Sequence, residues 1–236
     1  MRVPILMYHR IAPLNPQSVV KGHYVHPKMF ARQMGVLARL GYQAVPLRDL
    51  YDSDKTLPSK AVVVTFDDGY KNFSDNALPA LISHSFASTV FLVANLIGKS
   101  NEWDQGRGDV KEPLMGLQEI EMAADNGTEI GSHTLDHADL TAVDTAEAWR
   151  QIAESKAVLE KVLGTEVGSF CYPYGRKTPE VQAMVRKAGY RLACSTEKGL
   201  NHSNTDRTAL RRINVRSDTL MPVFLYKLIR GARVAR

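Results

Sequence analysis

The chain has 236 residues, 44% of them hydrophobic and 23% charged, which is the balance of a globular protein with a large core. No apolar run reaches the ~20 residues that a membrane span requires. The first residues lack the apolar stretch and cleavage site of a secretory signal, so we expect a cytoplasmic protein. Two cysteines, Cys171 and Cys194, are too few for a disulfide framework and favour a reducing compartment.

The net charge of +5 is concentrated near the C-terminus. Residues 207–236 carry eight Lys and Arg side chains against one acid, Asp218. No nucleic-acid-binding motif accompanies them, so we expect no nucleic-acid partner. We divide the chain into a main domain, residues 1–221, and a basic amphipathic tail, residues 222–236. The pattern of apolar and basic residues in the tail predicts a short helix. This helix either contacts an anionic membrane surface or packs on the main domain.

Strands alternate with helices along the whole chain, which is typical of a parallel sheet built from βα units. Seven or eight strands in one domain of this length favour an α/β barrel over an open sheet. The expected strands are 4–9, 43–47, 61–66, 88–94, 129–133, 168–172, 191–195 and 210–215. The expected helices are 26–40, 73–83, 114–126, 144–163 and 178–187, with a helical turn at 48–52 and a long loop at 98–113.

Two adjacent carboxylates, Asp67 and Asp68, follow the strand at 61–66 and precede a glycine. The run Ala-Val-Val-Val-Thr-Phe predicts a strand that is buried on both faces. Two like charges at the mouth of such a strand are costly unless a cation neutralises them. The plain alternative is an Asp-Asp-Gly turn that merely ends the strand.

Two histidines, His133 and His137, lie at the end of another expected strand. Together with a carboxylate from a different strand they offer three nitrogen and oxygen ligands and leave one coordination position open. A hydrolytic Zn²⁺ or similar divalent ion needs this arrangement to hold and activate water. In a barrel, the polar residues that follow the strands meet at one rim. The pattern therefore predicts a metal site there.

The segments Thr65–Tyr70, His133–His137 and Tyr172–Gly175 resemble the motifs of the polysaccharide deacetylase family, also called carbohydrate esterase family 4 or the NodB-homology domain. The resemblance extends from about residue 3 to about residue 215, and it is strongest to the exopolysaccharide, or poly-N-acetylglucosamine, deacetylase branch. It implies a distorted (β/α) barrel of about seven strands in a single domain. It also implies a metal-dependent hydrolase of carbon–nitrogen bonds that removes N- or O-acetyl groups from sugars.

The resemblance also implies roles for individual residues. Asp67 is the expected general base, and the expected metal ligands are Asp68, His133 and His137. The expected ion is Zn²⁺, with Co²⁺ or Ni²⁺ as alternatives. A backbone amide in the third motif, at Tyr172 or its neighbourhood, is expected to stabilise the oxyanion. The expected pocket comprises Tyr172, Pro173 and Tyr174, together with Trp103 from the long loop, which either stacks on a sugar or serves packing.

Two departures from the family pattern leave alternatives open. Cys171 occupies the place of an arginine that contacts the base, which we interpret as variation within the branch. Separately, one of Arg211 and Arg212 is expected to reach the site and the other to lie on the surface. The acid that protonates the leaving amine is either His9, after the first strand, or His202, in a Leu-Asn-His sequence; we favour His9.

We expect removal of N-acetyl groups from an amino-sugar polymer, an oligosaccharide or a lipid-linked glycan. The alternatives are hydrolysis of another amide or an O-acetyl ester in a small or nucleotide-linked substrate, and an inactive carbohydrate-binding homologue. The expected partner is a carbohydrate, and the oligomeric state stays open.

Overall fold

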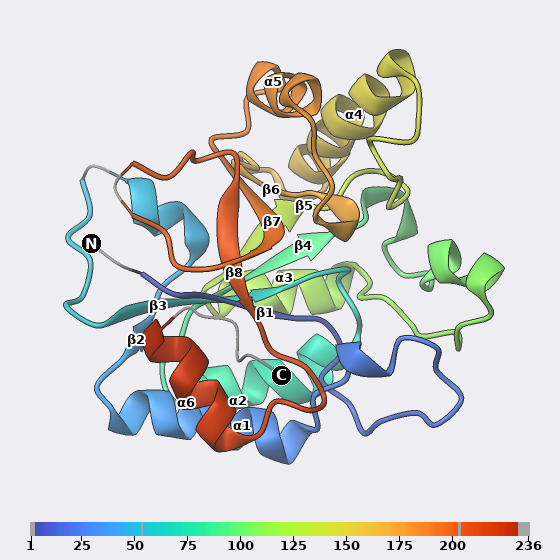
Figure 1. Ribbon diagram of the computed structural model, residues 1–236. Helices are drawn as coiled ribbons and strands as arrows, with labels where there is room; N and C mark the ends of the chain where they lie inside the picture. The colour runs from blue at the N-terminus through green and yellow to red at the C-terminus, as the bar shows by residue number, and fades with distance from the viewer. Residues whose placement is uncertain (1–2, 53, 203, 231–236) are drawn as a thin grey trace.

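The computed structural model describes residues 3–52, 54–202 and 204–230. In this part of the chain, seven parallel strands close into a barrel (Figure 1). They follow one another in chain order around the barrel, and the first pairs with both the second and the last. Their bounds are β1 (Ile5–Tyr8), β3 (Ala61–Phe66), β4 (Ser88–Leu92), β5 (Thr128–Ser132), β6 (Ser169–Cys171), β7 (Leu192–Lys198) and β8 (Leu210–Asn214). The short strand β2 (Gln43–Ala44) pairs with the start of β3 outside the barrel. The predicted barrel of about seven strands is confirmed.

Helices cover the outside of the barrel, with α1 and α2 on one side and α4 and α5 on the opposite side (Figure 1). Their bounds are α1 (Pro27–Arg39), α2 (Leu78–Ile82), α3 (Leu117–Asp125), α4 (Thr145–Leu163), α5 (Pro179–Lys187) and α6 (Met221–Arg230). None of the described helices is both long and apolar enough to cross a membrane.

Capping residues set several helix boundaries where the sequence predicts them. The Asp144 carboxylate accepts a hydrogen bond from the Glu147 amide at the start of α4. The same helix ends at Gly164, whose positive φ of 66° suits glycine. The Thr178 side chain caps α5, and Pro179 occupies its first turn.

The helix predicted at 73–83 is divided in the structure. Phe73–Ala77 forms a π-helical turn, and α2 follows with Pro79 in its first turn. Pro79 has no amide hydrogen to donate to the preceding turn, so a regular helix cannot run through this point. The wide turn also changes which face is buried, because each π turn contains an extra residue. Ile82, the last residue of α2, is 46% exposed.

The helix predicted to begin at 114 begins instead at Leu117. Leu114 pairs with Tyr70, and the Met115 amide donates a hydrogen bond to the Gly69 carbonyl. These residues are extended because they run beside the turn that follows β3. The end of the long 98–113 loop is thereby fixed to the Asp67–Asp68 region.

The C-terminal helix α6 packs against the barrel. Phe224 and Leu228 are buried in the main core, and the Lys227 ammonium group donates a hydrogen bond to the Asn214 carbonyl. The helix crosses the boundary predicted between residues 221 and 222, and residues 231–236 lie outside the described part. Membrane contact stays a prediction, and within α6 it would use the exposed side chains of Tyr226 and Ile229.

Replacing Leu228 with Ala is expected to lower the free energy of unfolding by about 2–5 kcal/mol, because a buried side chain leaves a cavity. The neighbouring Ile229→Ala is the matched control and is expected to change it by about 0.5 kcal/mol or less, since Ile229 is 66% exposed. Urea titration measures both. Equal effects of the two substitutions would mean that α6 does not pack as described.

Candidate active site

The alternation of side chains along β3 places Asp67 at the mouth of the barrel interior. Ala61 and Val63 belong to the apolar cluster inside the barrel, whereas Val62 and Val64 pack outward against the helices. Thr65 and then Asp67 continue the inward series, since every second side chain of a strand points the same way. On β8, Leu210 also faces inward, so Arg212 projects into the same space.

Arg212 donates two parallel hydrogen bonds to the Asp67 carboxylate. Its Nη1 and Nη2 atoms lie 2.6 Å and 2.7 Å from the two carboxylate oxygens. Arg212 also donates to the Ser195 carbonyl, to Thr65 Oγ1 and to Cys171 Sγ. Burial alone would raise the pKa of Asp67, but the charge and hydrogen bonds of Arg212 outweigh it and hold that pKa below its usual value. Arg212, and not the exposed Arg211, therefore reaches the site.

Asp68 faces away from Arg212 because the chain turns sharply after Asp67. Asp68 and Gly69 have φ angles of 76° and 71°. At position 69 a Cβ atom would lie 2.6 Å from a methyl carbon of Leu92, so any larger residue would strain this turn and displace the Leu92 side chain. Adjacent carboxylates in the sequence thus acquire different surroundings.

Two histidines from the loop after β5 face the Asp68 carboxylate. The Nε2 atoms of His133 and His137 lie 3.3 Å and 3.4 Å from Asp68 Oδ1, and all three residues are buried. The Nδ1 atom of His133 is 2.7 Å from the Cys171 carbonyl, which can only accept, so Nδ1 carries a hydrogen and Nε2 is the ring nitrogen that a metal ion would use. One potential ligand atom from each residue lies within 4.8 Å of the others. This buried set of two imidazoles and a carboxylate fits a divalent metal ion.

Backbone strain is concentrated around this set. Among the described residues, five other than glycine have positive φ, and four of them are in the site loops: Asp68, Thr134, His137 and Tyr174. Such conformations persist only where the surroundings enforce them. The Gln151 side chain of α4 does so for the histidine loop by accepting hydrogen bonds from the amides of Leu135 and Asp136.

His9 approaches Asp67 from the end of β1. Its Nε2 atom lies 3.9 Å from Asp67 Oδ2. Burial lowers the pKa of His9, although the nearby carboxylates of Asp67 and Asp68 oppose this shift. The His23 ring stacks on His9 with a centroid distance of 4.0 Å, a contact that the sequence did not predict. By contrast, His202 is exposed in the β7–β8 loop, where its amide donates to Thr205 Oγ1.

Hydrogen bonding after β6 restricts which backbone amide of the expected pocket is available. The Tyr172 amide donates to the Cys194 carbonyl within the sheet, and its hydroxyl donates to the Thr208 carbonyl. The amide hydrogen of Tyr172 is therefore already used, and an oxyanion-stabilising amide, expected at Tyr172 or its neighbourhood, stays a prediction for a neighbouring residue. Pro173 has no amide hydrogen, and Tyr174 is next, with its ring edge-on to His137 at 4.8 Å.

Trp103 lies beside the same histidine. Its ring stacks on His137 with a centroid distance of 4.5 Å, and it also contacts the buried Tyr70. It is only partly buried. Packing is thus an observed role of Trp103, and stacking on a sugar stays a prediction.

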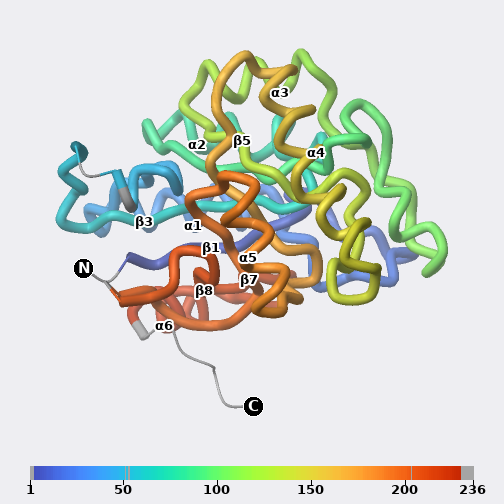
Figure 2. The backbone as a smooth tube through the Cα atoms, turned by 90° about the horizontal axis from the view of Figure 1, so that it is seen from above, coloured from blue at the N-terminus to red at the C-terminus, as the bar shows by residue number. Residues whose placement is uncertain are grey.

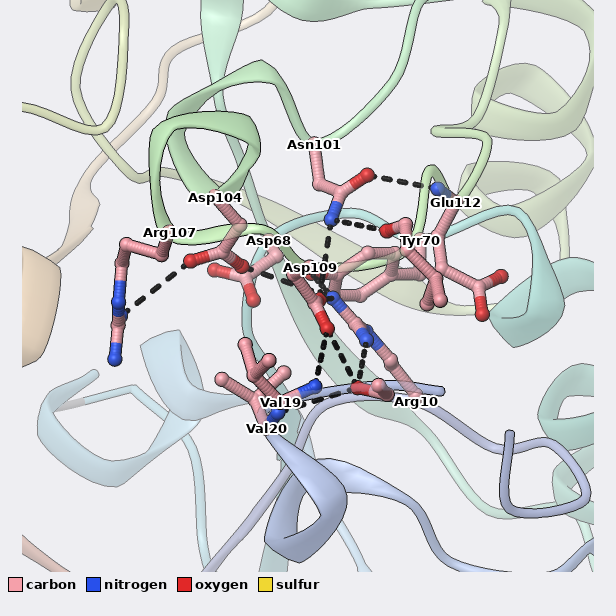
Figure 3. A network of polar contacts seen from close by, with 12 residues as sticks. Arg10, Val19, Val20, Asp68, Tyr70, Asn101, Asp104, Arg107, Asp109 and Glu112 are labelled. Carbon is pink, nitrogen blue, oxygen red and sulfur yellow. Dashed lines mark hydrogen bonds and ion pairs between the residues drawn. The ribbon is translucent and has the colours of Figure 1, made fainter. Parts of the chain in front are cut away.

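A buried arginine, Arg10, ties the Trp103 loop to the segment after β1 (Figure 3). Its Nη2 atom lies 2.7 Å from Asp109 Oδ2 and 2.8 Å from the Tyr70 hydroxyl, and Ser18 donates to the other Asp109 oxygen. Both loops extend to the same side of the barrel in Figures 1 and 2. Sequence reasoning missed Arg10 because its partner lies 99 residues away.

Replacing Arg212 with Leu is expected to destabilise the protein by about 3–5 kcal/mol, because it leaves the Asp67 carboxylate buried without a partner. The exposed neighbour Arg211→Leu is the control, expected to cost about 1 kcal/mol or less. Denaturant unfolding of both variants measures the difference. A loss below about 1 kcal/mol for Arg212→Leu would show that the ion pair does not govern this site.

Comparison with known proteins agrees with this geometry. A family model described as polysaccharide deacetylase matches residues 54–193, more than half of the chain. YxkH, a candidate polysaccharide deacetylase of Bacillus subtilis (strain 168), is 28% identical over 217 residues, covering 91% of this chain and 71% of that protein. The poly-beta-1,6-N-acetyl-D-glucosamine N-deacetylase of Escherichia coli (strain K12) is 25% identical over 87% of this chain, which spans only 35% of that relative.

A solved structure shares the fold over nearly the whole chain. BC0361, a polysaccharide deacetylase from Bacillus cereus, superposes with a TM-score of 0.82 and 27% identity, covering 97% of this chain and 69% of that one. The resemblance that the three sequence motifs carry is thereby confirmed, as is the predicted class of enzyme. The chain belongs to the polysaccharide deacetylase family, and it is a hydrolase that acts on carbon–nitrogen amide bonds of carbohydrates.

Proposed function

We propose that the protein removes N-acetyl groups from an amino-sugar polymer, oligosaccharide or lipid-linked glycan, with a divalent metal ion and Asp67 as the general base. The observation that carries this proposal is the different pairing of two adjacent buried carboxylates. Asp67 is held by Arg212, whereas Asp68 faces His133 and His137. One carboxylate is thus kept ionised at the reaction centre, and the other belongs to a ligand set.

We assign Asp68, His133 and His137 as the metal ligands. Two imidazoles and one carboxylate suit Zn²⁺ best, with Co²⁺ or Ni²⁺ as alternatives. A divalent ion bound there supplies Lewis acidity toward the acetyl carbonyl and lowers the pKa of a coordinated water.

We assign the proton transfers to residues on either side of this set. Asp67, kept ionised by Arg212, takes a proton from the attacking water. An ionised carboxylate has about four acceptor sites, so two hydrogen bonds from Arg212 leave room for another. His9 gives a proton to the departing amine, and its proximity to Asp67 favours it over the exposed His202.

For the oxyanion we assign the Tyr174 amide in place of that of Tyr172. The Tyr172 amide is used in the sheet, and Pro173 has none to offer. Tyr174 has a φ of 58°, which turns its peptide out of the strand direction, and no hydrogen bond from its amide is found within the described part of the chain. A backbone N–H directed at the developing negative charge stabilises a tetrahedral intermediate.

The names of the relatives favour glucosamine polymers as the substrate class. A small amide or an O-acetyl ester is the alternative, and an inactive carbohydrate-binding homologue is disfavoured because the full ligand set is present. Acetate release from N-acetylglucosamine oligomers, compared with release from small acetamides, separates the first two. Release from small acetamides alone would contradict the proposal.

Asp67→Asn is expected to retain metal but lose turnover by about 100-fold or more, the scale of a general base. Asp68→Asn is expected to lower the metal content after dialysis, because it removes one of three ligands. Elemental analysis and acetate release measure the two effects on protein whose folding is verified by circular dichroism. Retention of both metal and turnover in both variants would refute the assignment.

His9→Gln is expected to slow release from N-acetylglucosamine oligomers by about 100-fold, because the amine must be protonated as it leaves. An aryl acetate, whose phenolate leaves without a proton, is expected to be hydrolysed at nearly the wild-type rate. His202→Gln serves as the control and is expected to affect neither. Equal losses on the two substrates would exclude His9 as the acid, and a selective loss in His202→Gln would transfer the role.

A further inference from the structure

His23 and His9 lie side by side because their backbones pair. The Arg10 amide donates to the His23 carbonyl, and the Val25 amide donates to the Arg10 carbonyl, which is a parallel bridge between Arg10 and Tyr24. This pairing extends β1 beyond its last residue. Residues opposite one another in such a pair project from the same face.

The two faces of this bridge carry different contacts. On one face the Arg10 guanidinium donates to the Tyr24 hydroxyl and lies 5.0 Å from the ring centroid. One residue earlier, on the opposite face, the rings of His9 and His23 stack with an interplanar angle of 20°. The register of the backbone pairing therefore places the two histidine rings against each other. The contact of Arg10 with Tyr24, on the opposite face, stabilises that register.

His9 lacks the usual means of orienting a catalytic imidazole. A catalytic histidine is commonly held by a hydrogen bond from its second ring nitrogen. Among the contacts of the described residues, the His9 ring makes no hydrogen bond, and the 3.9 Å separation from Asp67 is too long for one. The stack with His23 is the contact that restrains the plane of the ring.

Metal binding is the competing role for His23, and the ring geometry opposes it. One potential ligand atom each from His9, His23 and Asp68 lies within 4.8 Å of the others. However, the nitrogen lone pairs of an imidazole lie in the plane of its ring. The rings of His9 and His23 stack face to face at 4.0 Å, so their lone pairs run side by side and do not converge on one ion. The rings of His133 and His137, by contrast, are 76° apart and both Nε2 atoms point at one Asp68 oxygen.

We propose that His23 is a positioning residue, which holds the plane of the His9 imidazole toward Asp67 by ring stacking. This inference rests on the proposed function, because it acts through His9 as the general acid. The role requires a flat ring at position 23, and it does not depend on the ring nitrogens. The buried Nδ1 atom of His23, which has no hydrogen-bond partner among the described residues, agrees with a role that uses the ring face.

The test compares His23→Phe with His23→Ala on N-acetylglucosamine oligomers. His23→Ala is expected to lower kcat about 5- to 10-fold, the scale of a lost aromatic pair, with KM within about twofold. His23→Phe keeps the ring and is expected to stay within about twofold of the wild type. Lys21→Ala, an exposed position in the same 3₁₀ helix (Lys21–His23), is the control and is expected to have no effect.

A double-mutant cycle shows whether His23 acts through His9. In the His9→Gln background, His23→Ala is expected to cause no further loss, because there is no acid left to position. The aryl acetate is expected to be hydrolysed equally by the wild type and His23→Ala. The same fold-loss in both backgrounds, or on both substrates, would overturn the inference.

Metal analysis tests the competing role of His23 as a metal ligand. Both His23 variants are expected to retain the metal content of the wild type, and a loss in both would identify His23 as a ligand and overturn the inference. If His9→Gln itself keeps full activity on the oligomers, the proposed acid fails. That result differs from the case in which His9→Gln loses activity but His23→Ala does not, where His9 is the acid and only the positioning role of His23 fails.

Discussion

Asp67 and Asp68 bring two negative charges into the mouth of a barrel whose surroundings exclude most water. Neither charge is tolerated there without compensation. Arg212 crosses the barrel interior from β8 to pair with Asp67, and two histidines from the loop after β5 turn toward Asp68. The division of roles between the carboxylates follows from this compensation, because the partners of each carboxylate differ.

Some of the residues that join strands inside the barrel also form the site. Inward positions on β3 and β8 carry Thr65 and Arg212, which hydrogen-bond to each other, so the strands and the site share one network. Beyond the strand ends, Asp68, Thr134, His137 and Tyr174 have positive φ angles and lie in the loops that carry the site. Rigid strands therefore position the charges, and the surrounding loops hold the strained geometry.

Much of this arrangement could be predicted from the sequence, because its signals are local. A buried strand that runs into Asp67 and Asp68, and two histidines four residues apart, are visible as short patterns. Barrel topology then follows from the alternation of strands and helices. The choice between Arg211 and Arg212 needed the inward–outward register of β8, which its short length did not reveal.

The contacts that were missed join distant segments. The Arg10–Asp109 pair spans 99 residues, and the His9–His23 stack depends on a backbone bridge outside any named strand. The choice of amide near Tyr172 was left open for a different reason. A motif identifies the neighbourhood of an amide, but only the sheet pairing shows that its hydrogen is already bonded to the Cys194 carbonyl.

The central claim is that adjacent carboxylates have separate roles, one as metal ligand and one as base. A crystal structure of the zinc-loaded protein, with anomalous scattering at the zinc edge, tests it directly. We predict one ion at about 2.0–2.2 Å from Asp68, His133 and His137, with Asp67 outside the coordination sphere and still paired with Arg212. Zinc bound directly to Asp67, or placed between His9, His23 and Asp68, would contradict the account.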